Sequence, residues 1–477
     1  LLGIALATIG ALTVGSAEVT ARLYLMAGLL AIVLALAIFM KPSLGANVLI
    51  LATFTNISTN LGDRGYPTIM KPLVALVAVA ILARYLYAER PSEGRSRTAR
   101  IEFSLFLFFA VTLLSFFVAS YKSRALEAII DLAKDIVIIY CILFTLRRPG
   151  VWKQSIWLVI LVTAFLSLLG MYQVLTGNYQ QDFFGLAAVQ GQKVFGEETT
   201  NRLAGPIDAP NLWGQVVVAV VPLVLYRLFH ASRPLVRVFS VLILGLLLFE
   251  VLNTYSRGAY LALLLIAALF LIEERSRPWL PVASVTLLAF LLLVSPSAYR
   301  ERFLTLINVA SSPGEGIYQE SSIRGRSSEM LTGLTMFAEH PLLGVGVGNY
   351  PNNYLRYAQR LGIEVRAEAR DPHSLYVQLL AETGILGFGT FLAMAFLLLK
   401  GLSDAKRDMM GTPFAERWMP WLSAMRLSII GYLTTSFFLH GAYIRYFWVL
   451  VALAMAAIRV TEELRLKLES ALPEDSF

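Results

Sequence analysis

The sequence predicts an all-α polytopic membrane protein with 12–14 transmembrane helices. Of the 477 residues, 57% are hydrophobic and only 15% are charged, whereas an average soluble domain has about 25% charged residues. The chain therefore has too little polar surface for a water-soluble fold, and this composition excludes a soluble enzyme, a disordered chain and a fibrous repeat. The only cysteine, Cys141, lies within an apolar run, which excludes an intrachain disulfide and a cysteine-based metal site.

Fourteen apolar segments are candidates for the spanning helices, because a helix needs about 20 apolar residues to cross the hydrocarbon layer. In chain order they are 1–16, 22–40, 43–60, 68–88, 102–119, 125–146, 152–175, 211–228, 236–253, 258–273, 279–295, 372–400, 423–440 and 443–460. The first pair is short and could form one broken hairpin, which gives the range of 12–14. The first stretch also lacks the basic region that begins a cleavable signal peptide.

Basic residues are concentrated in one set of connections between these segments, which predicts the orientation of the chain. One side holds 18 Lys and Arg, in the ranges 84–100, 147–153, 227–237, 275–277 and 400–426. The opposite short connections hold 5, namely Arg64, Lys122, Arg124, Arg257 and Arg445. The first side is therefore assigned to the cytoplasm, together with both termini. The net charge of +8 then reflects loops near anionic lipid, and no nucleic-acid partner is expected.

This orientation leaves two long polar segments outside and divides the chain into four parts. Residues 1–295 hold transmembrane helices with an outer loop at 176–210. Residues 296–371 form an outer, mostly helical domain, since a loop of about 76 residues without a function would be unusual. Residues 372–460 form the C-terminal transmembrane helices, and 461–477 form a cytoplasmic tail.

The outer domain contains eight arginines and no lysine. A guanidinium group is planar and permanently charged, and its paired donors suit a bidentate grip on phosphate oxygens. Arg324 and Arg326 are the candidates for such a grip, because they lie in the Ser/Gly-rich stretch from Ser321 to Arg326, with Glu329 close behind. The other six are open to a second interpretation, as members of surface ion pairs. These six are Arg300, Arg302, Arg356, Arg360, Arg366 and Arg370.

The stretch from Glu339 to Pro351 contains glycines at 344, 346 and 348. No strand precedes these glycines and Pro351 interrupts a following helix, so a dinucleotide-binding turn is a weak interpretation. Tight turning of the backbone is favoured instead. His340, which precedes a proline, is expected to be a structural turn residue.

A second histidine, His373, opens the apolar segment that ends near Lys400. Asp371 is a good N-cap residue and Pro372 suits position N1, so we expect His373 at position N2 of a helix. The positive end of the helix dipole disfavours an imidazolium there. The sequence thus predicts a neutral histidine at the outer membrane face, as a general base requires. The alternative is a structural histidine that only bonds a cap or loop carbonyl.

Two further arginines are candidates for contacts with an anion. Arg257 begins an apolar segment, where a charge is costly unless it faces a cavity or a counter-charge. It is either a phosphate clamp at the bilayer surface or the partner of Glu250. Arg202, near the end of the first outer loop, is either an anion ligand or a solvated loop charge.

A polar stripe lies on one face of the segment 125–146 and comprises Glu127, Asp131, Lys134 and Asp135. Such a stripe is compatible with a proton or ion relay of a transporter. An amphipathic interfacial turn with an internal Asp131–Lys134 pair is the favoured interpretation.

Taken in order, these motifs resemble the O-antigen ligase and polymerase superfamily. The motifs are Arg202-x-x-Gly205 with Pro210-Asn211-x-x-Gly214, Tyr255-Ser256-Arg257-Gly258 at the start of a span, Arg326 upstream of Glu339-His340-Pro341-x-x-Gly344-Val345-Gly346, and His373-Ser374 followed by Glu382-Thr383-Gly384-x-x-Gly387. Their order and spacing match from about residue 200 to residue 390. The N-terminal half resembles the superfamily only in hydropathy.

The resemblance implies a glycosyltransferase of the GT-C-like membrane type that needs neither a metal nor another cofactor. Such an enzyme moves a glycan from undecaprenyl pyrophosphate to an acceptor hydroxyl at the periplasmic face of the bacterial inner membrane. In O-antigen ligases the acceptor is the lipid A–core oligosaccharide. The enzyme is thus expected to be a multi-pass protein that works among membrane lipids, with an active site facing the periplasm.

Carried over residue by residue, His373 matches the catalytic histidine of the superfamily, Arg257 its span-opening arginine and Arg326 its loop arginine. Arg202 and Arg324 are further candidates for pyrophosphate contacts. Met330 stands where the superfamily often has an aromatic residue, which leaves Arg324 as the alternative to Arg326. The implied reaction is an inverting displacement, with His373 as general base and arginines stabilising the leaving pyrophosphate.

Two alternatives stay open from the sequence. A polysaccharide polymerase or a protein O-oligosaccharyltransferase of the same superfamily differs from the ligase only in its acceptor. A transporter or flippase of lipid-linked oligosaccharides belongs to another class and would use the polar stripe and the intramembrane arginines. The long outer domain that ends at a histidine favours the enzyme.

Overall fold

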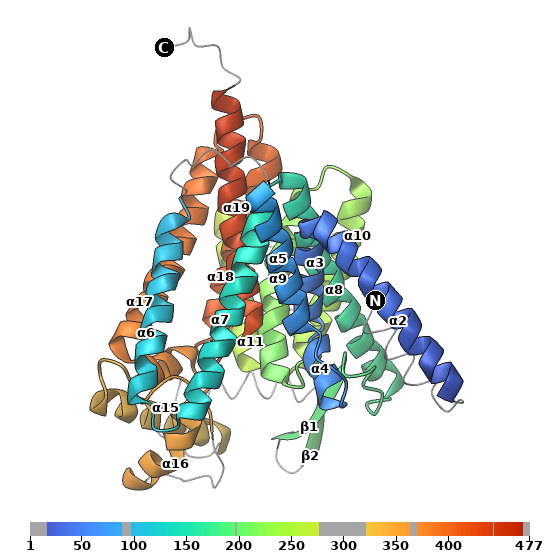
Figure 1. Ribbon diagram of the computed structural model, residues 1–477. Helices are drawn as coiled ribbons and strands as arrows, with labels where there is room; N and C mark the ends of the chain where they lie inside the picture. The colour runs from blue at the N-terminus through green and yellow to red at the C-terminus, as the bar shows by residue number, and fades with distance from the viewer. Residues whose placement is uncertain are drawn as a thin grey trace.

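The computed structural model describes residues 17–87, 97–195, 198–275, 321–362, 370–441 and 443–470. Within these ranges the chain forms fifteen helices and a single pair of strands (Figure 1). The all-α fold class predicted from composition is therefore confirmed, with the strand pair as its one exception.

The helices before residue 276 are α2 (Ala17–Met40), α3 (Pro42–Phe54), α4 (Ile57–Asp63), α5 (Met70–Tyr87), α6 (Ala99–Val118), α7 (Lys122–Thr145), α8 (Pro149–Thr176), α9 (Pro210–His230), α10 (Pro234–Asn253) and α11 (Arg257–Glu273). The later helices are α15 (Ser321–Glu339), α16 (Tyr350–Arg360), α17 (Leu375–Asp408), α18 (Ala415–Thr435) and α19 (Arg445–Glu469). The strands β1 (Ala188–Phe195) and β2 (Glu198–Gly205) form an antiparallel hairpin between α8 and α9.

Twelve of the fourteen predicted apolar segments fall on these helices, while 1–16 and 279–295 lie outside the described residues. The segment 43–60 is divided between α3 and α4, because Asn56 takes a left-handed backbone conformation with φ of 47°. Five of the described helices, α6, α8, α9, α10 and α17, are long and apolar enough to cross a membrane. The chain is thus a polytopic membrane protein, and the count of 12–14 spans stays a prediction.

Helix α19 lies deep in the bundle, since every residue from Tyr446 to Ile458 is buried. At the periphery, α6 instead exposes large apolar side chains, such as Phe103 at 61% and Phe117 at 76%. Apolar side chains that face outward suit a hydrocarbon environment, since a soluble protein rarely exposes so continuous an apolar surface. The bundle therefore has the surface of a protein that sits in lipid.

The segments that were expected outside the membrane lie together at one end of the bundle. Figure 1 shows the β1–β2 hairpin, α15 and α16 at the lower end, while the C-terminal end of α19 lies at the upper end. The expected outer loop 176–210 thus contains a strand hairpin. Leu203 and Ala204 of β2 are buried and anchor this hairpin on the bundle. Of the expected outer domain, 296–371, the structure describes residues 321–362 and 370–371. The first range holds α15 and α16, and residues 370 and 371 are irregular.

A kink divides α17 near its start. Gly384 has φ of 62° and ψ of −164°, which interrupts the helix. The carbonyls freed by the kink accept hydrogen bonds from the preceding glycine-rich loop, from Val345 N to Ala381 O (2.8 Å) and from Gly346 N to Glu382 O (3.1 Å). The loop glycines 344, 346 and 348 all have positive φ. These glycines thus allow the backbone to turn tightly, as predicted.

The polar stripe of α7 consists of ion pairs. Lys134 Nζ lies 2.6 Å from Asp131 Oδ1, Arg124 lies 3.2 Å from Glu127, and the buried Asp135 lies 2.7 Å from Arg445 Nε of α19. The predicted internal Asp131–Lys134 pair is confirmed. The stripe thus has a structural explanation that requires no ion relay.

Candidate functional site

His373 precedes the first turn of α17 and is not part of the helix. The helix begins at Leu375 with Ser374 as its N-cap, so the prediction of His373 at position N2 is wrong. The reason lies in the packing of α17 on α18, because Leu375 N donates to Ser436 O at 3.0 Å and thereby fixes where the helix starts. His373 takes a left-handed conformation with φ of 43°. Such a conformation is costly for a residue with a β-carbon and must be held by its surroundings.

The side chain of His373 faces a buried carboxylate on α15. Its Nε2 lies 3.7 Å from Oε2 of Glu329, whose side chain is only 2% exposed, while His373 itself is 28% exposed. A carboxylate at this distance stabilises an imidazolium once the ring takes up a proton. Because His373 lies outside the helix, the helix dipole no longer argues for a neutral ring. The structure shows instead a partly exposed histidine beside a buried carboxylate.

A second histidine–carboxylate pair lies next to the first. The rings of His373 and His440 are 5.6 Å apart between centroids, and His440 Nε2 lies 3.4 Å from Oδ2 of Asp371. Burial lowers the pKa of His440, although the Asp371 charge acts in the opposite direction. His440 is thus biased toward the neutral form. His440 lies in the connection between α18 and α19, which passes the start of α17.

Arg326 reaches this neighbourhood from α15. It lies one helical turn before Glu329 and is partly buried, so the two residues share a face of the helix. The same face therefore presents a guanidinium and the carboxylate that faces His373. Arg324 lies in the first turn of α15, but its side chain falls outside the described residues.

Arg257 begins α11, directly after the N-cap Ser256. The next residue, Gly258, packs against Phe438, because a β-carbon at Gly258 would lie 3.0 Å from the Cβ of Phe438. Phe438 stands two residues before His440. The connection between α18 and α19 thus contacts the start of α11 through Phe438 and lies beside His373 through His440. Arg257 and His373 therefore lie at the same end of the bundle.

Arg202 is buried and holds structural hydrogen bonds. It is 5% exposed, its Nε donates to Thr254 O at 2.8 Å, and its Nη2 donates to Asn211 Oδ1 at 2.7 Å. It is therefore not a solvated loop charge. It ties β2 to the turn that leads into Arg257 and to the first turn of α9.

Glu250 has its own partner within the bundle. The Nε1 of Trp213 donates to Glu250 Oε1 at 2.5 Å, and both side chains are buried. Gly170 lets the carboxylate approach α8, because a β-carbon there would lie 2.7 Å from Glu250 Oε2. Glu250 thus joins α8, α9 and α10.

The remaining histidines have other surroundings. His340 is exposed at the start of the glycine-rich loop, as expected of a turn residue. His230 lies at the opposite end of α9, with its Nε2 3.2 Å from Glu274. In the part of the chain that the structure describes, no group of three or more His, Cys, Asp or Glu residues is placed to hold a metal ion.

The sequence predicts no role for Glu329 or His440, and for Asp371 it predicts only a helix cap. Glu329 and His373 come from different elements, and no spacing in the chain indicates that they meet. His440 stands alone near the end of an apolar segment, and its partner Asp371 was read as a helix cap. The only signal in the sequence was that an acid and a histidine occur near the predicted outer face.

The arrangement combines a base with cations. His373 can accept a proton while Glu329 stabilises the charge that results. Arg326 and Arg257 enter the same end of the bundle from α15 and α11, where guanidinium groups can bind an oxyanion or a phosphate. This combination suits a transfer reaction in which an acceptor loses a proton and an anionic group departs.

The comparison with protein families gives one match. Residues 241–392 match the family model described as O-antigen ligase. This range contains Arg257, Arg326, Glu329 and His373, whereas Arg202 and His440 lie outside it. Among curated proteins, none matches the chain.

Proposed function

We propose that the chain, whose residues 241–392 match the family model described as O-antigen ligase, belongs to the O-antigen ligase and polymerase superfamily. In this proposal it transfers a glycan from undecaprenyl pyrophosphate to the lipid A–core oligosaccharide. The reaction takes place at the periplasmic face of the bacterial inner membrane. The observation that carries this proposal is the pair of His373 and the buried Glu329, 3.7 Å apart, on a helix face that also bears Arg326.

In the proposed reaction, His373 acts as the general base. The hydroxyl of the acceptor gives its proton to the ring of His373, and the acceptor oxygen attacks the anomeric carbon of the donor sugar. The bond from that carbon to the pyrophosphate oxygen breaks, and its electron pair leaves with the pyrophosphate. Attack from the face opposite the leaving group inverts the configuration at the sugar carbon.

Arginines replace the metal ion that many glycosyl transfers use. The pyrophosphate gains negative charge as the bond breaks, and guanidinium groups fixed beforehand stabilise this charge without reorganising. Arg257 and Arg326 are the proposed ligands, with Arg324 as the alternative on α15. Arg202 supports Arg257 through the Thr254 carbonyl, so we now propose for it a positioning role.

The test uses purified protein with undecaprenyl-pyrophosphate glycan and lipid A–core. We expect His373→Ala to lower turnover by at least about a hundredfold, since a positioned general base contributes about that much or more. His340→Ala is the matched control, because His340 is an exposed histidine at the same end of the bundle. Unchanged turnover of His373→Ala would show that the proposed base is wrong.

Three further measurements separate this proposal from its alternatives. EDTA should leave activity intact, whereas a loss of activity that a divalent ion restores would contradict the arginine-based mechanism.

In a deletion strain, rough lipopolysaccharide beside intact lipid-linked glycan indicates a ligase. Chain-length defects or unglycosylated proteins would instead indicate a polymerase or a protein O-oligosaccharyltransferase. Translocation of glycolipid in vesicles without any acceptor would indicate a flippase.

A further inference from the structure

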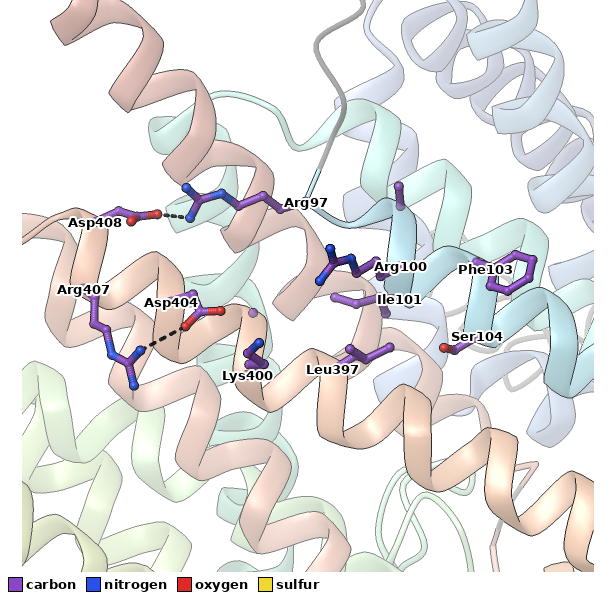
Figure 2. Close-up of a pocket in the computed structure, with 12 residues that line it drawn as sticks. Arg97, Arg100, Ile101, Phe103, Ser104, Leu397, Lys400, Asp404, Arg407 and Asp408 are labelled. Atoms are coloured by element: carbon purple, nitrogen blue, oxygen red, sulfur yellow. Dashed lines mark hydrogen bonds and ion pairs between the residues drawn. The ribbon is translucent and has the colours of Figure 1, made fainter.

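A cavity of about 890 Å³ lies between the start of α6 and the end of α17 (Figure 2). It is remote from His373, because α17 rises about 37 Å between Leu375 and Lys400 at 1.5 Å per residue. The cavity is therefore not part of the proposed active site. It lies on the side that the basic loops assign to the cytoplasm.

Six charged side chains line the cavity, and four of them pair with one another. Arg97 bonds Asp408, and Arg407 lies 3.4 Å from Asp404. The two others, Arg100 of α6 and Lys400 of α17, make no hydrogen bond or ion pair with any residue in the described ranges. Figure 2 shows them on facing helices. The cavity thus offers two positive charges that form no ion pair with any residue that the structure describes.

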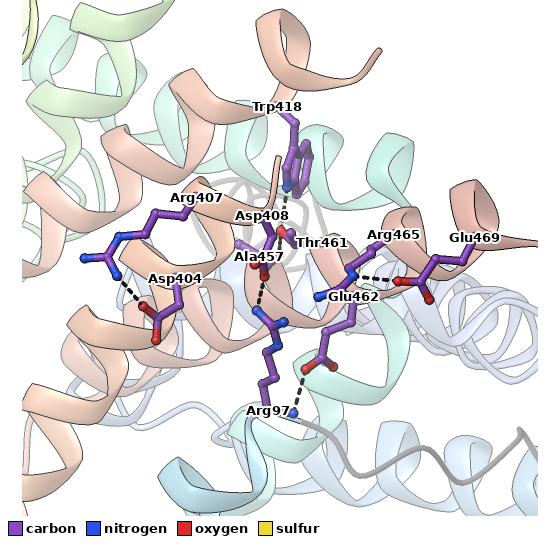
Figure 3. A network of polar contacts seen from close by, with 10 residues as sticks. All are labelled: Arg97, Asp404, Arg407, Asp408, Trp418, Ala457, Thr461, Glu462, Arg465 and Glu469. Carbon is purple, nitrogen blue, oxygen red and sulfur yellow. Dashed lines mark hydrogen bonds and ion pairs between the residues drawn. The ribbon is translucent and has the colours of Figure 1, made fainter. Parts of the chain in front are cut away.

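Polar contacts beside this cavity join the segment before α6 to α17 and α19, and α18 to α19 (Figure 3). The backbone N–H of Arg97 donates to Glu462 Oε1 of α19 at 2.6 Å. Next to it, Trp418 of α18 donates to Thr461 Oγ1 at 2.8 Å. Gly401 allows α17 to approach closely, since a β-carbon there would lie 2.8 Å from Ile458. These contacts hold Arg97 and the end of α17 against α19.

The start of α6 adds a further attraction for anions. Ala99, Arg100 and Ile101 are the first three residues of α6, and all three line the cavity. The first N–H groups of a helix have no acceptor within the helix, and they form the positive end of its dipole. Phosphate groups bind readily at such positions.

The opposite part of the lining is apolar and continues onto the surface that faces lipid. Phe103 lines the cavity and is 61% exposed, and Phe106, one turn further along α6, is 62% exposed. On α17, Leu397 lines the cavity and the adjacent Phe396 is 66% exposed. A ligand that fits this lining has an anionic head and a hydrocarbon tail that leaves toward the bilayer.

We infer that this cavity binds the headgroup of an anionic glycerophospholipid, with its phosphate between Arg100 and Lys400 and an acyl chain along Phe103 and Phe106. Basic pockets between transmembrane helices on the cytoplasmic side are typical sites for anionic headgroups. A zwitterionic headgroup carries no net charge to match the two cations. A free phosphate ion makes no use of the apolar lining.

The inference is tested by native mass spectrometry of the full-length protein, released from detergent micelles with added phosphatidylglycerol. We expect one lipid to be retained at about tenfold lower concentration than phosphatidylcholine. Replacing both cations, in Arg100→Gln with Lys400→Gln, should abolish this preference. Exchanging them, in Arg100→Lys with Lys400→Arg, should preserve it and thereby show that charge is what matters.

The matched control removes two exposed cations from the same end of the bundle but outside the cavity, in Arg233→Gln with Arg417→Gln. This variant should bind phosphatidylglycerol as the unmodified protein does. Equal retention by the Arg100/Lys400 glutamine variant, or equal loss in the control, would overturn the inference. Competition by inorganic phosphate at the concentration of the lipid would also overturn it, because the ligand would then be the ion alone.

Discussion

At the scale of single residues, the candidate site depends on a histidine held in an unusual backbone conformation. The motif around His373 indicates its position at the outer end of a span, but not its conformation or its partner. These follow from α17 starting at Leu375 and from α15 packing on α17, which no local pattern encodes. The sequence thus finds the proposed base, whereas the carboxylate beside it comes only from the tertiary structure.

The first prediction concerns Glu329 as the residue that positions His373. Replacing its carboxylate by an amide, in Glu329→Gln, removes the charge that stabilises the imidazolium in the transition state. We expect kcat to fall by about tenfold to a hundredfold, with KM for the donor little changed. Steady-state kinetics on lipid-linked glycan measure both constants. Partial recovery in Glu329→Asp supports the assignment, and an effect on KM alone would contradict it.

The second prediction concerns the stability of the protein at acid pH. Burial lowers the pKa of His440 in the folded state, while an unfolded histidine has a pKa of about 6.5. The unfolded chain therefore binds more protons than the folded one between these two values. The stabilisation is complete above about pH 6.5 and is lost as the pH falls toward the folded-state pKa.

Thermal unfolding in detergent at pH 7.5 and pH 5 measures this effect. We expect the midpoint to fall on acidification in the unmodified protein and to fall less in His440→Asn, which cannot take up the proton. His340→Asn is the control, because an exposed histidine has little reason to affect the difference. The same pH dependence in all three proteins argues against His440 as its source.

At the scale of elements, the apolar segments predicted the helices well, because span length and hydropathy are local properties of the chain. The breaks within them were harder to predict. Gly384 lies inside an apolar segment, where a glycine alone does not indicate a kink. The kink exists because the loop from Pro341 to Gly346 bonds the carbonyls that it frees. The β1–β2 hairpin was also missed, since its strands are polar and lack an alternating pattern.

The third prediction tests this kink. In Gly384→Ala, the new β-carbon would lie 2.4 Å from the backbone of Leu342, in a conformation that disfavours any side chain. Conformational strain alone costs about 1–3 kcal/mol, so we expect a lower thermal midpoint and reduced transfer activity. Gly389→Ala is the control on the same helix, because nothing lies within 4 Å of its β-carbon position. That variant should be neutral or slightly stabilising. A Gly384→Ala protein as stable as Gly389→Ala would show that the kink is not required.

At the scale of the whole molecule, the fold gathers the β1–β2 hairpin, α15, α16 and the candidate site at one end. The start of α6 and the end of α17, which line the proposed lipid-binding cavity, lie at the other end (Figure 1). The charge asymmetry of the loops predicts which end faces the cytoplasm, since each set of connections corresponds to one end of the bundle. The orientation in the membrane is thus predicted by the distribution of Lys and Arg in the sequence, whereas the arrangement of the helices does not indicate it.

The last prediction tests this orientation with single cysteines. The only native cysteine, Cys141, is buried and is replaced by serine to give a background without thiols. Thr199 of β2 and Gln359 of α16 are exposed at the end with the candidate site, and Arg233 and Met410 are exposed at the opposite end. In intact spheroplasts, a thiol reagent that does not cross membranes should label cysteines at 199 and 359. Cysteines at 233 and 410 should react only after permeabilisation.

The reverse pattern would place His373 on the cytoplasmic side, where the enzyme could not reach a periplasmic acceptor. Labelling of both ends from outside would contradict the transmembrane arrangement itself.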